Sequence, residues 1–256
     1  MRNSTLPVLA VLLAIAISAT MDFTGYTLFS ALPLVVIIAL FWLLLRLSKK
    51  EIGLKFGPLK YYGIALLYPL LVLGATGLIA YIYGDFSVKE INIKNELLNL
   101  GVGLVIGPIM LMLTEEGFFR GWLWGAFRKA RFSPNQTLYI TSGCFVLWHI
   151  SAVTCGSDFS LPITQVPVYL TNALFLGLIW GTMRMASGSI IAPAFCHAVW
   201  NTFAYGLFGF GEKTGILGVS NTALLGPEVG YLGILLNGLF FLWLWKVTKK
   251  SRAETS

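Results

Sequence analysis

Eight apolar runs, each long enough to cross a lipid bilayer, constrain this chain more than any other feature. They cover about residues 5–21, 27–45, 61–83, 97–127, 136–153, 165–183, 188–210 and 229–246. A transmembrane helix needs about 20 mostly apolar residues. The fourth run is too long for one span, and we expect it to begin with a surface segment. Only 11% of the residues are charged, against about 25% in soluble domains. The sequence therefore predicts an all-α, polytopic membrane helix bundle of about eight spans.

The basic residues predict the orientation of this bundle. If the N-terminus is cytoplasmic, fourteen of the 18 Lys and Arg residues fall in cytoplasmic segments, three (Lys89, Lys94 and Lys213) fall on the other side, and Arg120 lies inside a span. Because positive residues are enriched in cytoplasmic loops, both termini are expected in the cytoplasm. The net charge of +7 is confined to short loops between apolar runs, so we expect the lipid bilayer as environment and no nucleic-acid partner. Residues 1–256 are read as one membrane domain.

Two segments leave alternatives open. The first run has small residues near Ala19 and could be a cleaved signal peptide, but it is longer than a usual signal-peptide core and the next run follows closely. An uncleaved first span is therefore favoured. The basic, aromatic segment 49–62 is expected either along the cytoplasmic membrane surface or as an ordinary loop, and 212–228 as an outer loop. Four aromatic residues are expected to face lipid or the interface, without a function: Phe208, Phe210, Trp243 and Trp245.

Three charges lie inside the fourth run, within LMLTEEGFFRGWLWG. A charged side chain at the centre of a span costs about 2.5–3.5 kcal/mol, so such residues are candidates for function. Glu116 and Arg120 are four residues apart and can pair on one helix face. Glu115 is rotated from Glu116 by about 100°, which leaves it free to take a proton. The alternative is that Glu116 and Arg120 form a pair that only fixes helix packing, but this alternative does not explain Glu115.

Both histidines of the chain also fall inside spans. His149 follows Phe145 by four residues, and His197 precedes Asn201 by four residues, so His197 and Asn201 share a helix face. A lone membrane histidine often serves only as an interhelical hydrogen-bonding residue. Here both histidines occur with a carboxylate pair on a third helix.

The depth of these residues in the membrane gives a separate argument. Glu115 lies 13 residues before Arg128, His149 lies 14 residues after Asn135, and His197 lies 13 residues after Arg184. At about 1.5 Å per residue, all three lie about 20 Å from the cytoplasmic boundary. Equal depth on three helices predicts one common site.

This set of residue types suits water activation at a carbonyl group. A carboxylate in a low-dielectric site is a competent general base near neutral pH, and a histidine can orient the same water. A second histidine and an asparagine amide can donate hydrogen bonds to a developing oxyanion. No serine or cysteine lies in an evident nucleophile motif, so we expect no acyl-enzyme.

The three motifs together resemble those of the CPBP family of intramembrane proteases, also called the ABI or CAAX-protease family. The chain is similar to type II CAAX prenyl endopeptidases and to bacterial relatives linked with bacteriocin and peptide processing. The family pattern EExxxR, FxxxH and HxxxN occurs here in order at 115–120, 145–149 and 197–201. The resemblance covers about residues 108–205, within a core of about 97–210.

The resemblance implies a role for each motif residue. Glu115 and His149 would activate the water, and His197 and Asn201 would bind the oxyanion or position the water. Glu116 and Arg120 would order the site or engage the substrate, and Phe145 would pack beside it.

The mechanism has two alternatives, because the family has been described both as metalloproteases and as glutamic proteases. Glu115, His149 and His197 would suffice as zinc ligands with one open position. The motif HExxH is absent, and the three residues come from separate helices. We therefore expect a metal-free, glutamate-driven mechanism, with zinc as the alternative.

Two other classes of function are compatible with the sequence. A proton-coupled transporter could use Glu115 and the histidines as a relay, although no inverted repeat or pair of broken helices is evident. A non-catalytic immunity or scaffold protein could retain the fold.

The partner expected for a protease is a membrane-bound peptide or protein. No organelle-targeting signal is evident, which favours the plasma membrane of a bacterium or archaeon. A leader peptide or small membrane protein is then expected as substrate rather than a prenylated CAAX protein. The compact loops favour access from the bilayer or the cytoplasmic face, and the sequence does not specify an oligomeric state.

Overall fold

The computed structural model describes residues 4–88, 92–157, 159–211 and 213–253, which are almost entirely helical. The long helices are α1 (Thr5–Phe23), α2 (Pro33–Leu44), α4 (Lys60–Tyr83), α5 (Ile93–Leu113), α7 (Pro134–Cys155), α8 (Val166–Ser187), α9 (Ile191–Phe208) and α11 (Tyr231–Ala253). The short elements are η1 (Thr27–Phe29), α3 (Lys49–Ile52), the π-helix η2 (Gly117–Trp122), α6 (Leu123–Lys129) and α10 (Thr222–Leu225). Strands β1 (Gly209–Phe210) and β2 (Lys213–Thr214) form a small antiparallel hairpin.

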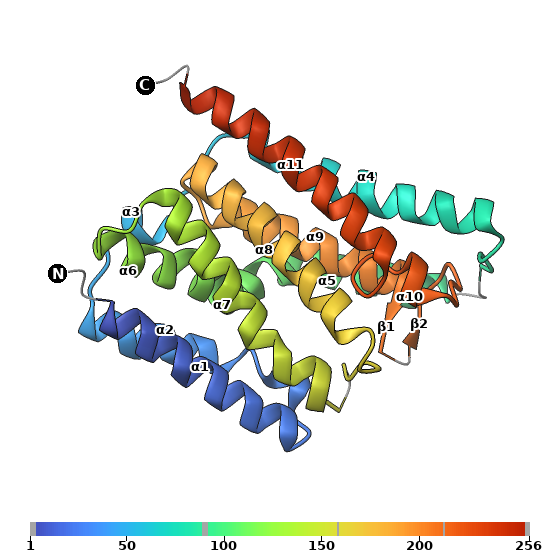
Figure 1. Cartoon of the computed structure of the whole chain (residues 1–256), viewed down its shortest axis with the longest axis horizontal. Coiled ribbons are helices and arrows are strands. Elements are labelled where there is room, and N and C mark those ends of the chain that lie inside the picture. Colours follow the sequence, from blue (N-terminus) through green and yellow to red (C-terminus); the bar gives the residue numbers. More distant parts are fainter. Residues whose placement is uncertain (1–3, 89–91, 158, 212, 254–256) are drawn as a thin grey trace.

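The long helices pack as a bundle with α7, α8 and α9 in the middle (Figure 1), and α5 packs on α9 from the outside. Helices α1 and α2 pack on each other and cover one side of the bundle, where α1 contacts α7. Helices α4 and α11 cover the other side, where α4 contacts α9 and α11 contacts α8. The predicted all-α polytopic membrane bundle is confirmed.

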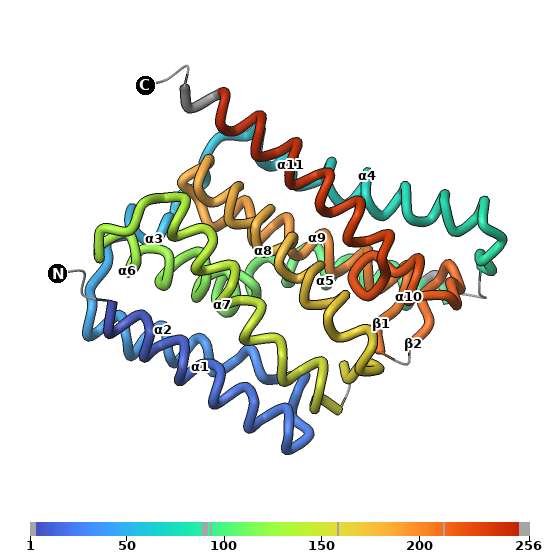
Figure 2. Tube along the Cα trace, in the orientation of Figure 1, coloured from blue at the N-terminus to red at the C-terminus, as the bar shows by residue number. Residues whose placement is uncertain are grey.

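The two ends of the bundle differ in charge. Short helices α3 and α6 lie at one end, together with the start of α1 and the last turns of α11, and the β1–β2 hairpin and α10 lie at the other (Figure 2). We call these the basic end and the hairpin end. The basic end carries the lysines and arginines of the loops around α3 and α6. It is therefore the end that the positive-inside rule predicts to be cytoplasmic.

Seven stretches of the described chain are long and apolar enough to cross a membrane: α1, η1 with α2, α4, α5, α7, α8 and α11. The expected eighth span, 188–210, forms helix α9, but α9 is not among the seven. Polar residues such as His197 and Asn201 lower the hydropathy of this 18-residue helix. Helix α9 is shielded instead, because α4, α5 and α8 pack around it.

The fourth apolar run, 97–127, was expected to begin with a surface segment, but it is divided by a break in the helix, and its first part belongs to a candidate membrane span. Helix α5 ends at Leu113, and Thr114 leaves the helical conformation with φ −105° and ψ −102°. The chain then restarts as a helix at Glu115 and Glu116 and continues as η2 and α6. A Cβ atom on Gly117 would lie only 2.2 Å from the Met112 carbonyl oxygen, so the break requires glycine there. It places both carboxylates at a helix N-terminus, where the helix dipole favours negative charge.

Helix α1 is held in the bundle by buried polar contacts. The Trp148 indole donates to Ser18 Oγ at 2.6 Å, and Ser151 Oγ donates to Asp22 Oδ2 at 2.6 Å. Ser18 Oγ in turn donates to the Ser30 carbonyl at 3.0 Å. These contacts favour the uncleaved first span, which stays a prediction.

Ser18→Ala is expected to lower the stability of the bundle by about 1–3 kcal/mol, because it leaves the buried indole N–H of Trp148 unpaired. Thermal unfolding of the detergent-solubilised protein measures the change. Thr20→Ala is the matched control, since its exposed hydroxyl bonds only to its own helix at Ala16. Equal unfolding temperatures for the two variants would contradict the prediction.

The basic, aromatic segment 49–62 forms α3 and the start of α4 at the basic end. Ser48 and Glu51 form a capping box at the start of α3. Next to the lysines, three apolar side chains are exposed: Leu54, Phe56 and Leu59. Exposed apolar groups beside positive charges favour the interfacial reading of this segment.

Candidate active site

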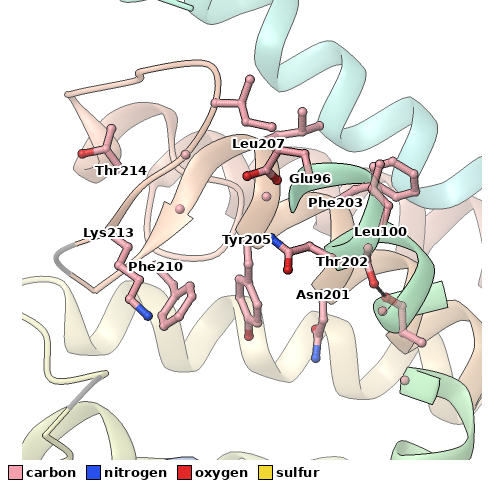
Figure 3. Close-up of a pocket in the computed structure, with 18 of the residues that line it drawn as sticks. Glu96, Leu100, Asn201, Thr202, Phe203, Tyr205, Leu207, Phe210, Lys213 and Thr214 are labelled. Atoms are coloured by element: carbon pink, nitrogen blue, oxygen red, sulfur yellow. Dashed lines mark hydrogen bonds between the residues drawn. The ribbon is translucent and has the colours of Figure 1, made fainter. Parts of the chain in front are cut away.

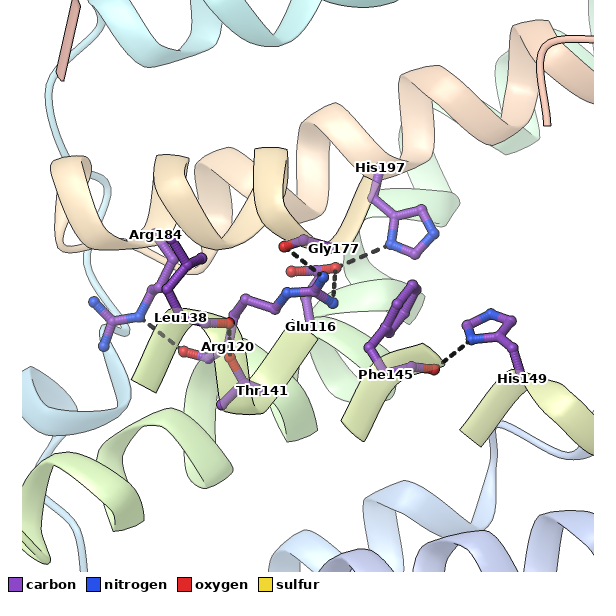
Figure 4. A network of polar contacts seen from close by, with 9 residues as sticks. All are labelled: Glu116, Arg120, Leu138, Thr141, Phe145, His149, Gly177, Arg184 and His197. Carbon is purple, nitrogen blue, oxygen red and sulfur yellow. Dashed lines mark hydrogen bonds and ion pairs between the residues drawn. The ribbon is translucent and has the colours of Figure 1, made fainter. Parts of the chain in front are cut away.

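The site lies where α7, α9 and the segment that begins at Glu115 meet in the middle of the bundle (Figure 4). Helix α7 provides Phe145 and His149, and α9 provides His197 and Asn201. The third segment begins after the helical break at Thr114 and provides Glu115 and Glu116. The structure therefore brings the motif residues of three helices to one region.

The centre of this region is the fully buried ion pair of Glu116 and Arg120. Glu116 Oε1 accepts from Arg120 Nη1 at 3.0 Å and lies 3.1 Å from His197 Nδ1. Arg120 Nη2 donates to the Gly177 carbonyl of α8 at 3.2 Å. Its guanidinium lies 4.4 Å from the ring centre of Phe145. The pair predicted from the four-residue spacing is formed, and it joins α7, α8 and α9.

Both histidine rings are held in fixed orientations. The His149 Nδ1 atom lies 2.8 Å from the Phe145 carbonyl of its own helix. Because a carbonyl only accepts, Nδ1 carries the proton and Nε2 is free as an acceptor. The His197 ring stacks on Trp180 with 3.7 Å between ring centres. The Phe145 ring contacts both histidines, at 4.3 Å from His149 and 6.3 Å from His197.

Glu115 differs from Glu116 because no side-chain hydrogen bond holds it in the part of the chain that the structure describes. Its Oε2 atom is buried without a partner among the described residues. The carboxyl group lies within electrostatic range of His197, Glu116 and Arg120. A buried oxygen without a hydrogen bond costs free energy, and Glu115 is the residue that is expected from the sequence to take a proton.

Asn201 lies on the wall of a cavity between α5 and α9, which we call the α5–α9 cavity (Figure 3). This cavity holds about 670 Å³ and runs along α5 from Glu96 to Leu111, four residues before Glu115. Among the described residues, no side-chain hydrogen bond joins Asn201 to the ion-pair cluster. Asn201 therefore lies where a molecule in the cavity would meet the site.

A second cavity of about 740 Å³ lies beside the β1–β2 hairpin, and we call it the hairpin cavity. It shares Tyr205, Phe210 and Lys213 with the α5–α9 cavity. Its wall includes Tyr169, whose ring centre lies 6.1 Å from that of His149. Both cavities thus lie between the site and the hairpin end.

Several residues near the site were missed or misread from the sequence. Phe208 is buried and lines the hairpin cavity, and Phe210 lines both cavities, so neither simply faces lipid. Glu228 also lines the hairpin cavity, although it belongs to a segment predicted to be an outer loop. One feature of the sequence could have pointed to Glu228: it is the single acidic residue between Lys213 and Ala253.

The residues proposed as zinc ligands do not gather as a metal site needs. In the described part of the chain, no three His, Cys, Asp or Glu side chains lie close enough together to hold a metal ion. The Nδ1 atoms of both histidines face protein oxygens, at Phe145 and Glu116, an arrangement that is also common for histidines that bind zinc through Nε2. The described side chains do not gather as a zinc site requires, and a metal-free mechanism stays a prediction.

The fold and the site together define a polytopic membrane protein that holds glutamates, histidines and an arginine between its helices. Residues 95–203 match the family model described as type II CAAX prenyl endopeptidase Rce1-like. The resemblance to the CAAX-protease family is confirmed over this segment, which contains all of the motif residues. The chain is thus a multi-pass membrane protein whose residues 95–203 are similar to the CAAX-type endopeptidases. No curated protein matches the chain.

Proposed function

We propose that this protein is an intramembrane endopeptidase that uses a water molecule activated by Glu115 and His149. The observation that carries the proposal is the carboxyl group of Glu115, whose Oε2 atom is buried without a hydrogen bond among the described residues, beside two oriented histidines. A general base must be free to accept a proton within reach of the water. Glu116 is already engaged by Arg120 and His197, so Glu115 is the better candidate.

The roles of the other residues follow from their bonding. His149 has Nε2 free, so it can accept a hydrogen bond from the attacking water and orient it. His197 faces Glu116 with Nδ1, so its Nε2 atom is the one that can donate to the oxyanion. Asn201, on the next turn of α9, would add a second donor from the cavity wall.

A proton-coupled transporter is the alternative, and the broken helix at Thr114 is the observation that favours it. Discontinuous helices form the substrate sites of many transporters, where they come in corresponding pairs. Uptake of a substrate into proteoliposomes under a pH gradient, without peptide cleavage, would support the transporter. A scaffold role is favoured if loss-of-function phenotypes survive every substitution at the site.

Substrate access is proposed from the hairpin end or from the bilayer between α5 and α9, not from the cytoplasmic face. Toward the basic end the site is covered, because Arg184 donates to the carbonyls of Arg120 at 2.8 Å and Glu51 at 2.9 Å. The two large cavities lie on the opposite side. With the basic end in the cytoplasm of a bacterial or archaeal cell, a leader peptide or small membrane protein would enter from the outer half of the plasma membrane.

The test is cleavage by the purified protein in liposomes, before and after chelation. The probe is a pool of internally quenched apolar decapeptides, with cleavage sites read by mass spectrometry. We expect cleavage by protein without stoichiometric zinc, unaffected by a chelator. Stoichiometric zinc that is lost together with activity would replace the glutamate mechanism by a metal mechanism. Absence of cleavage of every peptide would count against the protease.

The close packing of α5 on α9 provides a further prediction. A Cβ atom on Gly103 would lie 2.4 Å from Thr202 Oγ1, so a small residue is needed where the helices touch. Gly103→Leu is expected to push α5 away and shift Glu115, which follows α5 in the chain. A displacement of about 1 Å can lower turnover about 10²-fold. Cleavage rates in liposomes measure the effect.

Gly101→Leu is the matched control, because nothing lies within 4 Å of a Cβ at Gly101. It is expected to retain the activity of the natural protein. Equal rates for the two variants would show that the spacing of α5 and α9 does not position Glu115.

A further inference from the structure

Glu228 lies in the turn before α11 and carries an acidic group into the hairpin cavity. Its Oε1 atom accepts a hydrogen bond from the indole N–H of Trp200, which is next to Asn201 on α9. In the described part of the chain, its Oε2 atom has no hydrogen bond and no lysine or arginine forms an ion pair with it. The carboxyl group is also within electrostatic range of Glu115 and His197. Glu228 thus presents one free oxygen close to the proposed site.

The main chain around Glu228 is fixed by a buried network of amides. Asn172 Nδ2 donates to the Glu228 carbonyl at 2.8 Å, and Asn237 Nδ2 donates to Asn172 Oδ1 at 3.0 Å. Tyr68 Oη donates to Asn237 Oδ1 at 2.7 Å, and the Tyr68 ring stacks on Trp200. The network joins α4, α8, α9 and α11. A turn held from four helices positions the carboxyl group instead of leaving it mobile.

The surroundings of Glu228 favour a positively charged ligand. Burial raises the pKa of Glu228, and the hydrogen bond from Trp200 opposes this effect only in part. A cation that entered the cavity would compensate the desolvated carboxylate. The cavity wall offers aromatic rings at Tyr169, Tyr205 and Phe208, which attract cations and pack against an aliphatic stem. Lys213 also lines this cavity, but its Nζ lies 5.0 Å from the ring centre of Phe210 and forms no ion pair with Glu228 in the described chain, so it does not neutralise this carboxylate.

We infer that the hairpin cavity is a specificity pocket in which Glu228 binds an arginine or lysine side chain of the peptide substrate. The inference rests on the proposed function, because it takes the ligand to be a peptide that extends from the site. The cavity is reached from the site past Tyr169, which contacts both the cavity and His149. Glu228 would be a specificity-determining residue that touches the substrate at a side chain near the bond to be cleaved.

The experiment measures peptide binding, which does not depend on turnover. The full chain carries Glu115→Gln to prevent hydrolysis, and the probes are fluorescein-labelled apolar decapeptides with one arginine scanned along the sequence. Each is compared with the peptide that has neutral citrulline at that position. At one or two positions, arginine is expected to lower the dissociation constant about 10–100-fold. Fluorescence anisotropy in detergent reads the constants.

Glu228→Gln is the decisive variant, since an amide oxygen can still accept from Trp200 while the charge is lost. It is expected to abolish the preference for arginine over citrulline, with little change in the binding of the citrulline peptide. Glu228→Lys is expected to reverse the preference toward a glutamate peptide. Glu96→Gln is the control, because Glu96 is an acid that lines only the α5–α9 cavity. Thermal unfolding of each variant verifies that it is folded.

Two outcomes would overturn the inference. One is a preference for arginine that survives Glu228→Gln in a folded protein, and the other is no preference at any position in the parent protein. Failure of the proposed function is a separate result. If the protein cleaves no peptide but its preference for arginine depends on Glu228, the result would support the pocket and count against the protease function.

Discussion

Glu115→Gln is expected to reduce peptide cleavage by about 10²–10⁴-fold, the contribution typical of a positioned general base. Glutamine has nearly the same size and shape, but its amide cannot accept a proton from water. Because Glu115 makes no hydrogen bond that holds the fold, the variant is expected to unfold at the same temperature as the natural protein or slightly above it. Loss of activity without loss of stability is the result that identifies a base.

The measurement is the initial rate of cleavage in liposomes at equal amounts of folded protein. Glu51→Gln is the matched control, since it removes one negative charge at the basic end, where Glu51 caps α3. It is expected to cleave at close to the natural rate. Full activity of Glu115→Gln would refute the glutamate mechanism. A parallel loss of activity and stability would assign Glu115 a structural role.

The membrane bundle could be predicted because hydropathy depends on composition alone. The apolar runs gave the positions of the long helices, and the basic residues gave the end at which α3 and α6 lie. The break at Thr114 could not be predicted, because an apolar run has the same hydropathy whether it forms one helix or two. Its cause is local and steric, in the close approach of Gly117 to the Met112 carbonyl.

Contacts between polar residues of the site could be predicted only where both residues lie on the same helix. The spacing of Glu116 and Arg120 predicted their ion pair. The contact of His197 with Glu116 joins residues 81 positions apart, so spacing along one helix does not reveal it. The position of Glu228 depends on Asn172 and Asn237 in two other helices. A lone acid in a loop is usually solvated, which is why the sequence alone assigned it no role.

Together, the charges of the site explain how it tolerates burial. Arg120 compensates Glu116 through their ion pair, so these two residues are close to neutral together, although each charge alone is costly inside a membrane. We therefore expect substitution of Glu115 to affect mainly the cleavage rate and substitution of Arg120 to affect mainly the stability of the fold.

Arg120→Met is accordingly expected to destabilise the protein by about 3–5 kcal/mol, because it leaves the buried carboxylate of Glu116 without its main partner. It also removes the hydrogen bond to the Gly177 carbonyl and the contact with Phe145. The free energy of unfolding in detergent, measured with a denaturant, gives the change. Arg128→Met is the control, because Arg128 is an exposed arginine on α6 at the basic end.

The double variant Glu116→Gln/Arg120→Met distinguishes two causes of the lost stability: the loss of the contacts of Arg120, and the unpaired charge of Glu116. If the cost arises from the carboxylate that remains, removing its charge is expected to recover most of the lost stability, since buried ion pairs replaced at both partners are often close to neutral in effect. A double variant no more stable than Arg120→Met would assign the cost to the contacts of Arg120 with α7 and α8. A single variant as stable as the natural protein would contradict the role of the pair in the fold. Recovery of stability without recovery of cleavage would mean that Glu116 also orients His197 for the reaction, as their 3.1 Å contact suggests.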